Sequence, residues 1–226
     1  MTSFSYTKYD KMNMVNIMKA LITGSSSGLG KELAYILDDM GYSIILVGRN
    51  GKELNKIKMS LKNDSKVVVT DLLKINNVYK LYSDNKDIDI LINCAGAGEI
   101  GSFIDTINDL DIIDLNIKAL HILTKLYLKD FVKKDSGRIL NISSSAAFTP
   151  GPLFSTYYAT KSYVYSLTMS IYEELRRNKS NVKISVACPG AFDSDFLKKA
   201  KINEVKYLKS TKYIASYIIK KMFKVN

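Results

Sequence analysis

The feature that most constrains the fold is a regular alternation of short apolar runs with longer segments of helical periodicity. The runs are rich in β-branched residues and almost continuously apolar, which is typical of strands covered on both faces of a sheet. They span residues 20–23, 43–47, 66–70, 88–93, 138–143 and 183–187. Helical periodicity is found over residues 29–40, 54–61, 115–132, 155–177 and 211–223. This alternation predicts a three-layer α/β fold with a parallel, doubly wound sheet and right-handed crossovers.

Length and composition favour one domain. A chain of 226 residues can bury a sizeable core, and it shows no internal repeat or linker. We therefore expect one domain over residues 18–226, preceded by a poorly ordered extension over residues 1–17. No apolar run approaches a membrane span in length, and the first residues lack the apolar core of a signal peptide. By elimination the sequence predicts a cytoplasmic protein with no membrane partner.

The charged and metal-ligating residues point to no further partner. The 33 Lys and Arg residues outnumber the 22 Asp and Glu residues, which gives a formal charge of +11. The lysines are scattered and no aromatic–basic motif accompanies them, so we predict no nucleic-acid partner. Cys94 and Cys188 imply a reducing compartment, and strand spacing places them ~10 Å apart, too far for a disulfide. His121 is the only histidine, so we predict no metal site.

The first predicted strand runs directly into a turn rich in glycine and serine. Glycines allow the backbone to approach a pyrophosphate, and the following helix directs its free N–H groups at the phosphates. The spacing is Gly-x-x-x-Gly-x-Gly, which differs from the more common Gly-x-Gly-x-x-Gly. A loop that only joins strand to helix is the alternative, but the position after the first strand favours a Rossmann-type dinucleotide site. Its predicted cofactor contacts are Gly24, Ser26, Ser27, Gly28, Leu29 and Gly30.

The end of the second predicted strand bears on the choice of cofactor. A site for NAD(H) places a carboxylate there to bind the ribose 2′-hydroxyl. Here the chain reads Gly48-Arg49-Asn50, and the next acid is Glu53. A guanidinium complements a 2′-phosphate in charge and geometry, so Arg49 favours NADP(H) over NAD(H). A solvated surface arginine is the alternative interpretation.

Three side chains could perform acid–base chemistry. Tyr157 and Lys161 lie four residues apart on a predicted helix and therefore share a face. An ammonium beside a phenol favours the phenolate, so we expect Lys161 to lower the pKa of Tyr157. Ser144 ends the fifth predicted strand, where open α/β sheets bind ligands, and its hydroxyl could donate to a developing alkoxide. The alternatives are a chance spacing for the pair and ordinary turn chemistry for the serine.

Taken in order along the chain, these motifs resemble those of the short-chain dehydrogenases/reductases. The resemblance covers residues 19 to about 216 and includes the glycine turn, Asn93-Cys94-Ala95-Gly96 and Asn116. It also includes Ser144 thirteen residues before Tyr157, and Pro189-Gly190 followed by Ser194. Cys94 stands where the family has a second asparagine, and a small thiol fills similar space.

The resemblance implies an enzyme that transfers hydride between NADP(H) and a carbonyl or alcohol substrate. Tyr157 would be the general acid/base, Lys161 would hold the nicotinamide ribose, and Ser144 would orient the carbonyl. Asn116 would hold a water that relays protons to Lys161. The remaining implied cofactor contacts are Asp71, Leu72, Asn93, Ala95, Gly96, Pro189 and Gly190. This enzyme would be a carbonyl reductase acting on a small-molecule substrate.

The resemblance also bears on assembly and leaves other functions open. Family members usually have a seventh strand after the last helix, and here we expect six strands. Because that strand often supports tetramers, we expect a homo-oligomer that is a dimer in preference to a tetramer. A non-catalytic NADP-binding sensor or scaffold is the alternative function. It predicts degraded catalytic positions, whereas the residue types expected of an active enzyme are present at all four.

Overall fold

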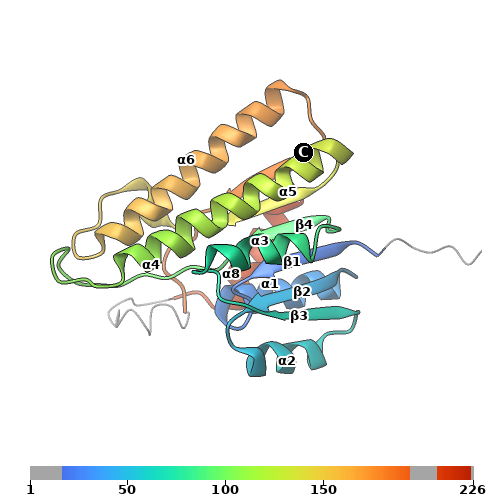
Figure 1. Cartoon of the computed structure of the whole chain (residues 1–226), viewed down its shortest axis with the longest axis horizontal. Helices are drawn as coiled ribbons and strands as arrows, with labels where there is room; N and C mark the ends of the chain where they lie inside the picture. The colour runs from blue at the N-terminus through green and yellow to red at the C-terminus, as the bar shows by residue number, and fades with distance from the viewer. Residues whose placement is uncertain (1–16, 194–207, 225–226) are drawn as a thin grey trace, which may run out of the picture.

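A computed structural model describes residues 17–193 and 208–224 of the chain (Figure 1). Its centre is a parallel sheet in the order β3-β2-β1-β4-β5-β6. The strands are β1 (Lys19–Thr23), β2 (Ser43–Gly48), β3 (Ser65–Val69), β4 (Ile90–Asn93), β5 (Arg138–Ile142) and β6 (Lys183–Ala187). The predicted doubly wound sheet is confirmed. The described residues contain no seventh strand, as expected.

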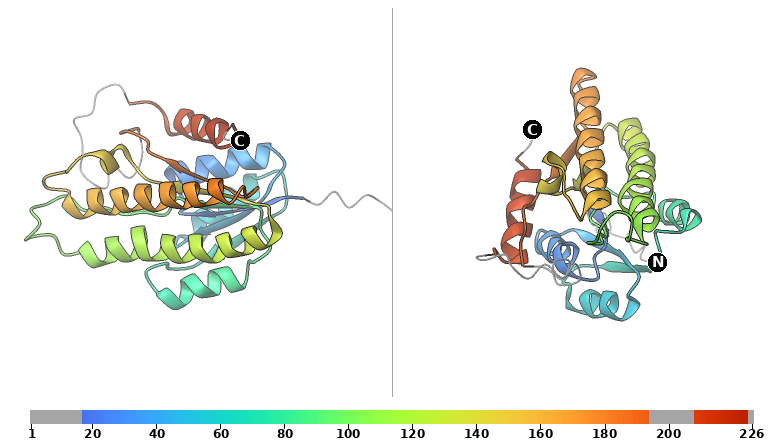
Figure 2. Two further views of the ribbon diagram at one scale, coloured as in Figure 1. Left: turned by 90° about the horizontal axis from the view of Figure 1, so that it is seen from above. Right: turned by 90° about the vertical axis from the view of Figure 1, so that its left-hand side faces the viewer.

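Helices cover both faces of the sheet because its strands carry apolar side chains on both sides. The helices are α1 (Gly28–Asp39), α2 (Gly51–Ser60), α3 (Ile75–Ser83), α4 (Asp109–Ile113), α5 (Leu120–Lys134), α6 (Ser155–Arg177) and α8 (Thr211–Met222). Figure 2 shows α1, α2 and α8 on one side and α3, α5 and α6 on the other. A buried cluster lies on each side, the first around Leu33, Leu46 and Ile219 and the second around Leu91, Leu123 and Tyr127. None of these helices is long and apolar enough to cross a membrane in the described part of the chain.

The helix before α5 departs from regular α geometry. Residues of η1 (Asp114–Ala119) form a π-helix between α4 and α5, where the sequence predicts one continuous helix from residue 115. Such π turns are rare and often lie at functional sites. Here the turn carries Asn116, which is buried.

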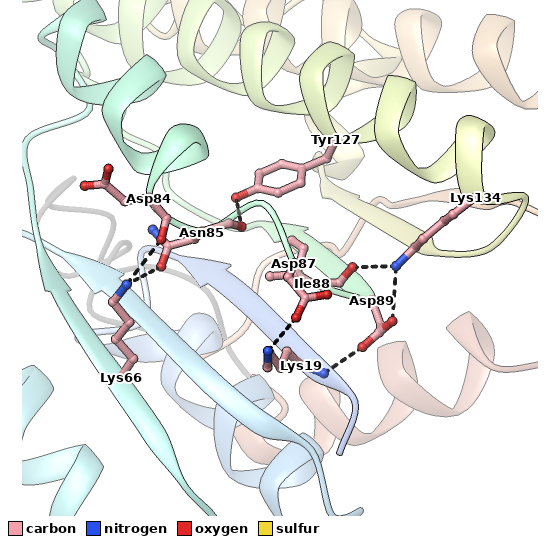
Figure 3. Close-up of polar contacts among 9 residues, drawn as sticks. All are labelled: Lys19, Lys66, Asp84, Asn85, Asp87, Ile88, Asp89, Tyr127 and Lys134. Atoms are coloured by element: carbon pink, nitrogen blue, oxygen red, sulfur yellow. Dashed lines mark hydrogen bonds and ion pairs between the residues drawn. The ribbon is translucent and has the colours of Figure 1, made fainter. Parts of the chain in front are cut away.

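The edge formed by the amino ends of the strands is closed by polar contacts (Figure 3). The Lys19 backbone N–H donates to the Asp89 carboxylate at 2.9 Å, and Lys134 Nζ donates to the Ile88 carbonyl at 2.8 Å. Lys134 also pairs with Asp89 at 3.2 Å. On the same edge, Tyr127 Oη donates to the Asn85 carbonyl at 2.9 Å. These bonds tie β1, β4 and α5 together at this edge.

The described residues that follow β6 end beside the residues that precede α8. The Asp193 N–H donates to the Lys209 carbonyl at 3.1 Å, and Asp193 forms a parallel bridge with Ser210. Ser210 then caps α8 by accepting from the Tyr213 N–H at 3.2 Å. Of the predicted extension over residues 1–17, all but the last residue lie outside the described residues, as do residues 194–207.

Candidate active site

A cavity of about 610 Å³ opens where the carboxyl ends of the strands meet, which is where parallel α/β sheets bind ligands. Most of the residues predicted from the sequence line it. These are Gly24, Ser26, Ser27, Gly28, Leu29, Gly30, Arg49, Asp71, Leu72, Ala95, Gly96, Ser144, Tyr157, Lys161, Pro189 and Gly190. Asn93 and Asn116 do not line the cavity and are buried beneath it.

The glycine turn between β1 and α1 leaves room for a ligand against the backbone. Gly24 and Gly28 have φ angles of 69° and 52°, which strongly favour glycine. A Cβ on Gly24 would lie 2.8 Å from Ala95, so the turn packs closely on the end of β4. Ser27, the N-cap of α1, makes no side-chain bond to the helix. The first N–H groups of α1 therefore remain available to a phosphate group.

Two buried side chains below the turn hold the strand ends together. Thr23 Oγ1 accepts from the N–H groups of Cys94 and Ala95 at 3.0 and 3.1 Å, which joins β1 to the end of β4. Asn93 Nδ2 donates to Thr124 at 3.0 Å and to Asn141 at 2.9 Å. Asn93 thus contributes to the support of the cavity floor rather than to its surface. The sequence did not indicate the contribution of Thr23.

Arg49 stands at the exposed end of the cavity. It follows β2, and the neighbouring Asn50 caps α2 by accepting from the Glu53 N–H at 3.2 Å. The Glu53 carboxylate pairs with Lys56 at 2.7 Å, which holds the pKa of that carboxyl below its usual range. A cation and a helix N-terminus therefore meet at this end, which suits an anionic group.

Tyr157, Ser144 and Lys161 come together at the other end. The hydroxyl of Tyr157 is hydrogen-bonded to Ser144. Lys161 is 6% exposed, its Nζ donates to the Ile142 carbonyl at 3.1 Å, and it lies 5.5 Å from the centre of the Tyr157 ring. The three predicted side chains thus meet at one end of the cavity, between the segment that follows β5 and the first two turns of α6.

Burial, rather than charge pairing, dominates the acid–base properties of these groups. It raises the pKa of Tyr157, and the hydrogen bond from Ser144 opposes that shift. It also lowers the pKa of Lys161 to about 8. The expectation that Lys161 lowers the pKa of Tyr157 stays a prediction, because burial is the largest cause of the shift and outweighs the groups that lower it. The ammonium is directed at the Ile142 carbonyl, and burial disfavours both charged forms.

Asn116 lies close to Lys161, on the far side of Gly96. Its Oδ1 accepts from the Ala97 N–H at 2.9 Å, and its Nδ2 donates to the Ala97 carbonyl at 2.8 Å and to Thr160 at 3.0 Å. Asn116 Oδ1 and Lys161 Nζ both lie within 3.5 Å of the point where a Cβ on Gly96 would stand. The missing side chain of Gly96 therefore leaves space between the amide and the ammonium.

An aromatic support for Tyr157 was not predicted from the sequence. Phe154 stacks on Tyr157, with ring centroids 4.4 Å apart and planes inclined by 12°. A Cβ on Gly98 would approach the Phe154 ring to 2.7 Å and the Tyr157 ring to 2.9 Å. The only signal in the sequence is the pair of glycines, Gly98 and Gly151, beside the aromatic run.

The residues present fit a dinucleotide. The glycine turn leaves a cradle that side chains would fill, and the cavity runs from the cationic Arg49 end to the phenol and ammonium. In the described residues no group of His, Cys, Asp and Glu side chains could hold a metal ion. The single histidine, His121, instead contacts the Tyr163 hydroxyl at 2.8 Å.

Comparisons with known proteins agree with this geometry. The family model described as short chain dehydrogenase matches residues 18–205. An uncharacterized oxidoreductase of Staphylococcus epidermidis is 35% identical over 198 residues, 84% of this chain and 85% of that protein. The 3-oxoacyl-[acyl-carrier-protein] reductase of Rickettsia prowazekii is 32% identical over 188 residues, 80% of this chain and 75% of that protein.

A solved structure extends the likeness to three dimensions. The short-chain dehydrogenase from Sphingobium yanoikuyae, in complex with NADPH, superposes with a TM-score of 0.84 at 25% identity. The match covers 90% of this chain and 83% of that one. Motifs, fold and family model thus lead to one assignment: this chain belongs to the short-chain dehydrogenases, a family of oxidoreductases.

Proposed function

We propose that this protein reduces a carbonyl compound with NADPH, with Tyr157 as the general acid. The observation that carries the proposal is the meeting of Tyr157, Ser144 and Lys161 at one end of a cavity whose other end holds Arg49. The likeness to a structure in complex with NADPH supports the choice of cofactor. The relative that reduces a 3-oxoacyl group supports the direction of the reaction.

Each residue has a separate task in this proposal. Bound NADPH supplies the hydride. Ser144 donates a hydrogen bond that orients the carbonyl oxygen, and Tyr157 gives its phenolic proton to that oxygen as negative charge develops. Because burial raises the pKa of Tyr157, the phenol holds its proton near neutral pH. Lys161 holds the nicotinamide ribose, and Asn116 holds a water that returns a proton to the site.

The cofactor contacts divide along the cavity. The glycine turn and the first turn of α1 would bind the pyrophosphate, and Arg49 would bind the 2′-phosphate. Asp71 and Leu72 would flank the adenine. Ala95, Gly96 and Pro189-Gly190 would contact the nicotinamide half. Arg49 is exposed and stands apart from the buried end of the cavity. It would therefore favour NADPH over NADH without contacting the reacting groups.

The test is turnover with a panel of aldehydes and ketones, including activated diketones, followed by the loss of NADPH absorbance. We expect NADPH-dependent reduction of several members and slower reduction with NADH. Binding of NADPH should be measured separately by fluorescence titration. NADPH binding with no turnover on any carbonyl would instead favour the non-catalytic sensor. Turnover that persists without the Tyr157 hydroxyl would contradict the mechanism.

A further inference from the structure

The last helix, α8, has a strongly basic outer side that the proposed function does not use. Residues 208–224 contain five lysines and no aspartate or glutamate, so this short segment holds +5 of the formal charge of +11. Its inner side is apolar and packs on the first buried cluster through Ala215, Ile218, Ile219 and Met222. The helix is therefore attached to the domain by one side and offers the other to a partner.

Lysine and tyrosine side chains alternate on this outer side, which we call the basic–aromatic face. It consists of Lys209, Tyr213, Tyr217, Lys220 and Lys221, all of them exposed. Helical periodicity places its helical members opposite the buried residues. Lys209 Nζ lies 4.5 Å from the centre of the Tyr213 ring, and Lys221 Nζ lies 5.4 Å from that of Tyr217. The cations and rings thus form one continuous surface.

The lysines of this face lack the acidic partners that basic residues have on other helices. Helices α2, α3 and α6 each pair a basic side chain with an acid about one turn away, in the pairs Lys56–Glu53, Lys80–Asp84 and Arg176–Glu173. Within the described residues no lysine of α8 forms an ion pair. On the neighbouring α1, Asp39 pairs with Lys62 instead. The positive charge of the face is therefore uncompensated and favours an anionic partner.

The two tyrosines indicate which anionic partner fits. Tyr213 and Tyr217 are 51% and 52% exposed and lie between Lys209 and the Lys220-Lys221 pair. Tyrosine is enriched where a bilayer meets water, and juxtamembrane lysines are attracted to anionic headgroups. A second copy of the face fits poorly, because lysines would oppose lysines across a two-fold axis.

The position of α8 leaves the face accessible to a flat surface. Figure 2 shows α8, in red, outside α1 in both views, and no other described helix lies beyond it. Its 12 residues give a length of about 18 Å, which allows contact with several lipid headgroups at once. The face also lies close to the cavity, because Phe192 lines the cavity and the next residue, Asp193, is bridged to Ser210.

We infer that the basic–aromatic face binds the surface of a membrane that contains anionic phospholipid, with the tyrosine rings at the level of the headgroups and the lysines at the lipid phosphates. The contact is peripheral and needs no spanning segment, whose absence from the sequence led to the expectation of no membrane partner. The inference does not depend on the proposed function.

The first test is sedimentation of the full chain with phosphatidylcholine vesicles, with and without phosphatidylglycerol. We expect binding only to the vesicles that contain phosphatidylglycerol. Raising the salt from about 0.05 M to about 0.5 M should release the protein, because salt screens contacts between exposed charges. Equal binding to both kinds of vesicle, or to neither, would overturn the inference.

The second test separates the position of the charge from its total. The double variant Lys220→Gln, Lys221→Gln should lower the partition coefficient on anionic vesicles about tenfold to thirtyfold. The matched control is Lys58→Gln, Lys74→Gln, which removes two exposed lysines elsewhere and leaves the same formal charge. It should change the coefficient less than about twofold. Equal losses in the two variants would attribute binding to total charge and contradict the inference. Thermal melting of both variants controls for folding.

The third test uses fluorescence to identify the surface in contact. The chain has no tryptophan, so the variant Tyr213→Trp reports on one position of the face. Its emission should shift to shorter wavelength with anionic vesicles and stay unchanged with neutral ones. Tyr79→Trp, at a 49% exposed position on α3, is the control and should show no shift. A shift in the control alone would place another surface on the membrane, and the inference would be wrong.

Two further measurements distinguish the other occupants of such a face. If duplex DNA shifts the emission of Tyr213→Trp and anionic vesicles do not, the face binds nucleic acid and the inference fails. If Lys220→Gln, Lys221→Gln changes the mass found by light scattering but leaves vesicle binding unchanged, the face is an interface between two copies. Weaker vesicle binding of that variant at an unchanged mass supports the inference.

Discussion

A lysine lies at the amino ends of the strands and another at their carboxyl ends, and the two have different surroundings. We call these two sides of the sheet its amino edge and its carboxyl edge. At the amino edge, Lys134 Nζ donates to the Ile88 carbonyl at 2.8 Å and pairs with Asp89. At the carboxyl edge, Lys161 Nζ donates to the Ile142 carbonyl at 3.1 Å and is buried, with a pKa of about 8. Both lysines bind a main-chain carbonyl beside a strand. Only the first has a carboxylate partner among the interactions of the described residues.

The difference shows how one type of side chain can serve either structure or chemistry. An exposed lysine with a carboxylate partner keeps its charge at little cost and stabilises the loops it joins. A buried lysine without one is held in an unfavourable charged form, which a ligand with complementary groups can relieve. We therefore expect substitutions at the carboxyl edge to change activity and those at the amino edge to change stability.

The largest effect is expected for Tyr157→Phe. Removing the hydroxyl removes the proton donor, and general acid catalysis contributes about 10²–10⁴-fold, so kcat should fall about 10³-fold. The NADPH dissociation constant should stay within about twofold, because the ring and its stacking on Phe154 remain. Tyr158→Phe is the matched control and should retain kcat. Comparable losses in both variants would show that the effect is structural.

Lys161→Met and Lys134→Met compare the two edges directly. Lys161→Met should lower kcat/KM about 10²-fold, as for other lost electrostatic groups, and should leave the free energy of unfolding unchanged or raised because a buried charge is removed. Lys134→Met should leave kcat unchanged and lower the free energy of unfolding by about 0.5–1 kcal/mol. Urea unfolding and steady-state kinetics measure both. Reversed outcomes would remove the distinction between the edges.

Arg49→Asp tests whether the exposed end of the cavity acts independently of the buried end. A hydrogen bond to a charged group contributes about 1.5–3 kcal/mol, so the NADPH dissociation constant should rise about 10–100-fold. NADH binding should change little, and kcat at saturating cofactor should be retained. Fluorescence titration with both cofactors measures this. If NADPH and NADH weaken equally, Arg49 does not recognise the 2′-phosphate.

The smallest expected effect is a fall of kcat/KM for NADPH at alkaline pH, caused by the loss of the proton of Lys161. Its pKa of about 8 means that the ammonium loses its proton as the pH rises through that value. Because kcat/KM for NADPH reports the enzyme before cofactor binding, it should fall about tenfold per pH unit above about 8. Lys161→Arg keeps a proton throughout this range and should remove this fall. If kcat/KM of that variant falls over the same pH range, the titrating group is not Lys161.

The strands and the long helices could be predicted from the local periodicity of apolar residues. Helix α6 spans the predicted residues 155–177, and five of the six strands lie within a residue of prediction at each end. Helix α3 was not predicted, because it has only nine residues and its N-cap, Lys74, makes no capping bond. The π-helix was not foreseen either, since its extra residue per turn leaves no distinct period in so short a stretch.

Prediction of the site succeeded where residues lie in contiguous motifs. Most predicted cofactor contacts line the cavity because the turns at the strand ends must face it. Asn93 does not, because it lies on β4, where alternation turns its side chain towards α5. The stacking of Phe154 on Tyr157 against Gly98 depends on two distant loops meeting, which no local pattern encodes.

The closure at Asp193 and Lys209 has a consequence for how this scaffold can diverge. Because the two positions are bonded to each other, the residues between them can change in number without moving β6 or α8. Doubling the number of residues between two fixed points of a chain costs only about 0.6 kcal/mol of closure entropy. Changes in the number of residues between Asp193 and Lys209 should therefore cost little stability, while the residues at the carboxyl ends of the strands keep their positions.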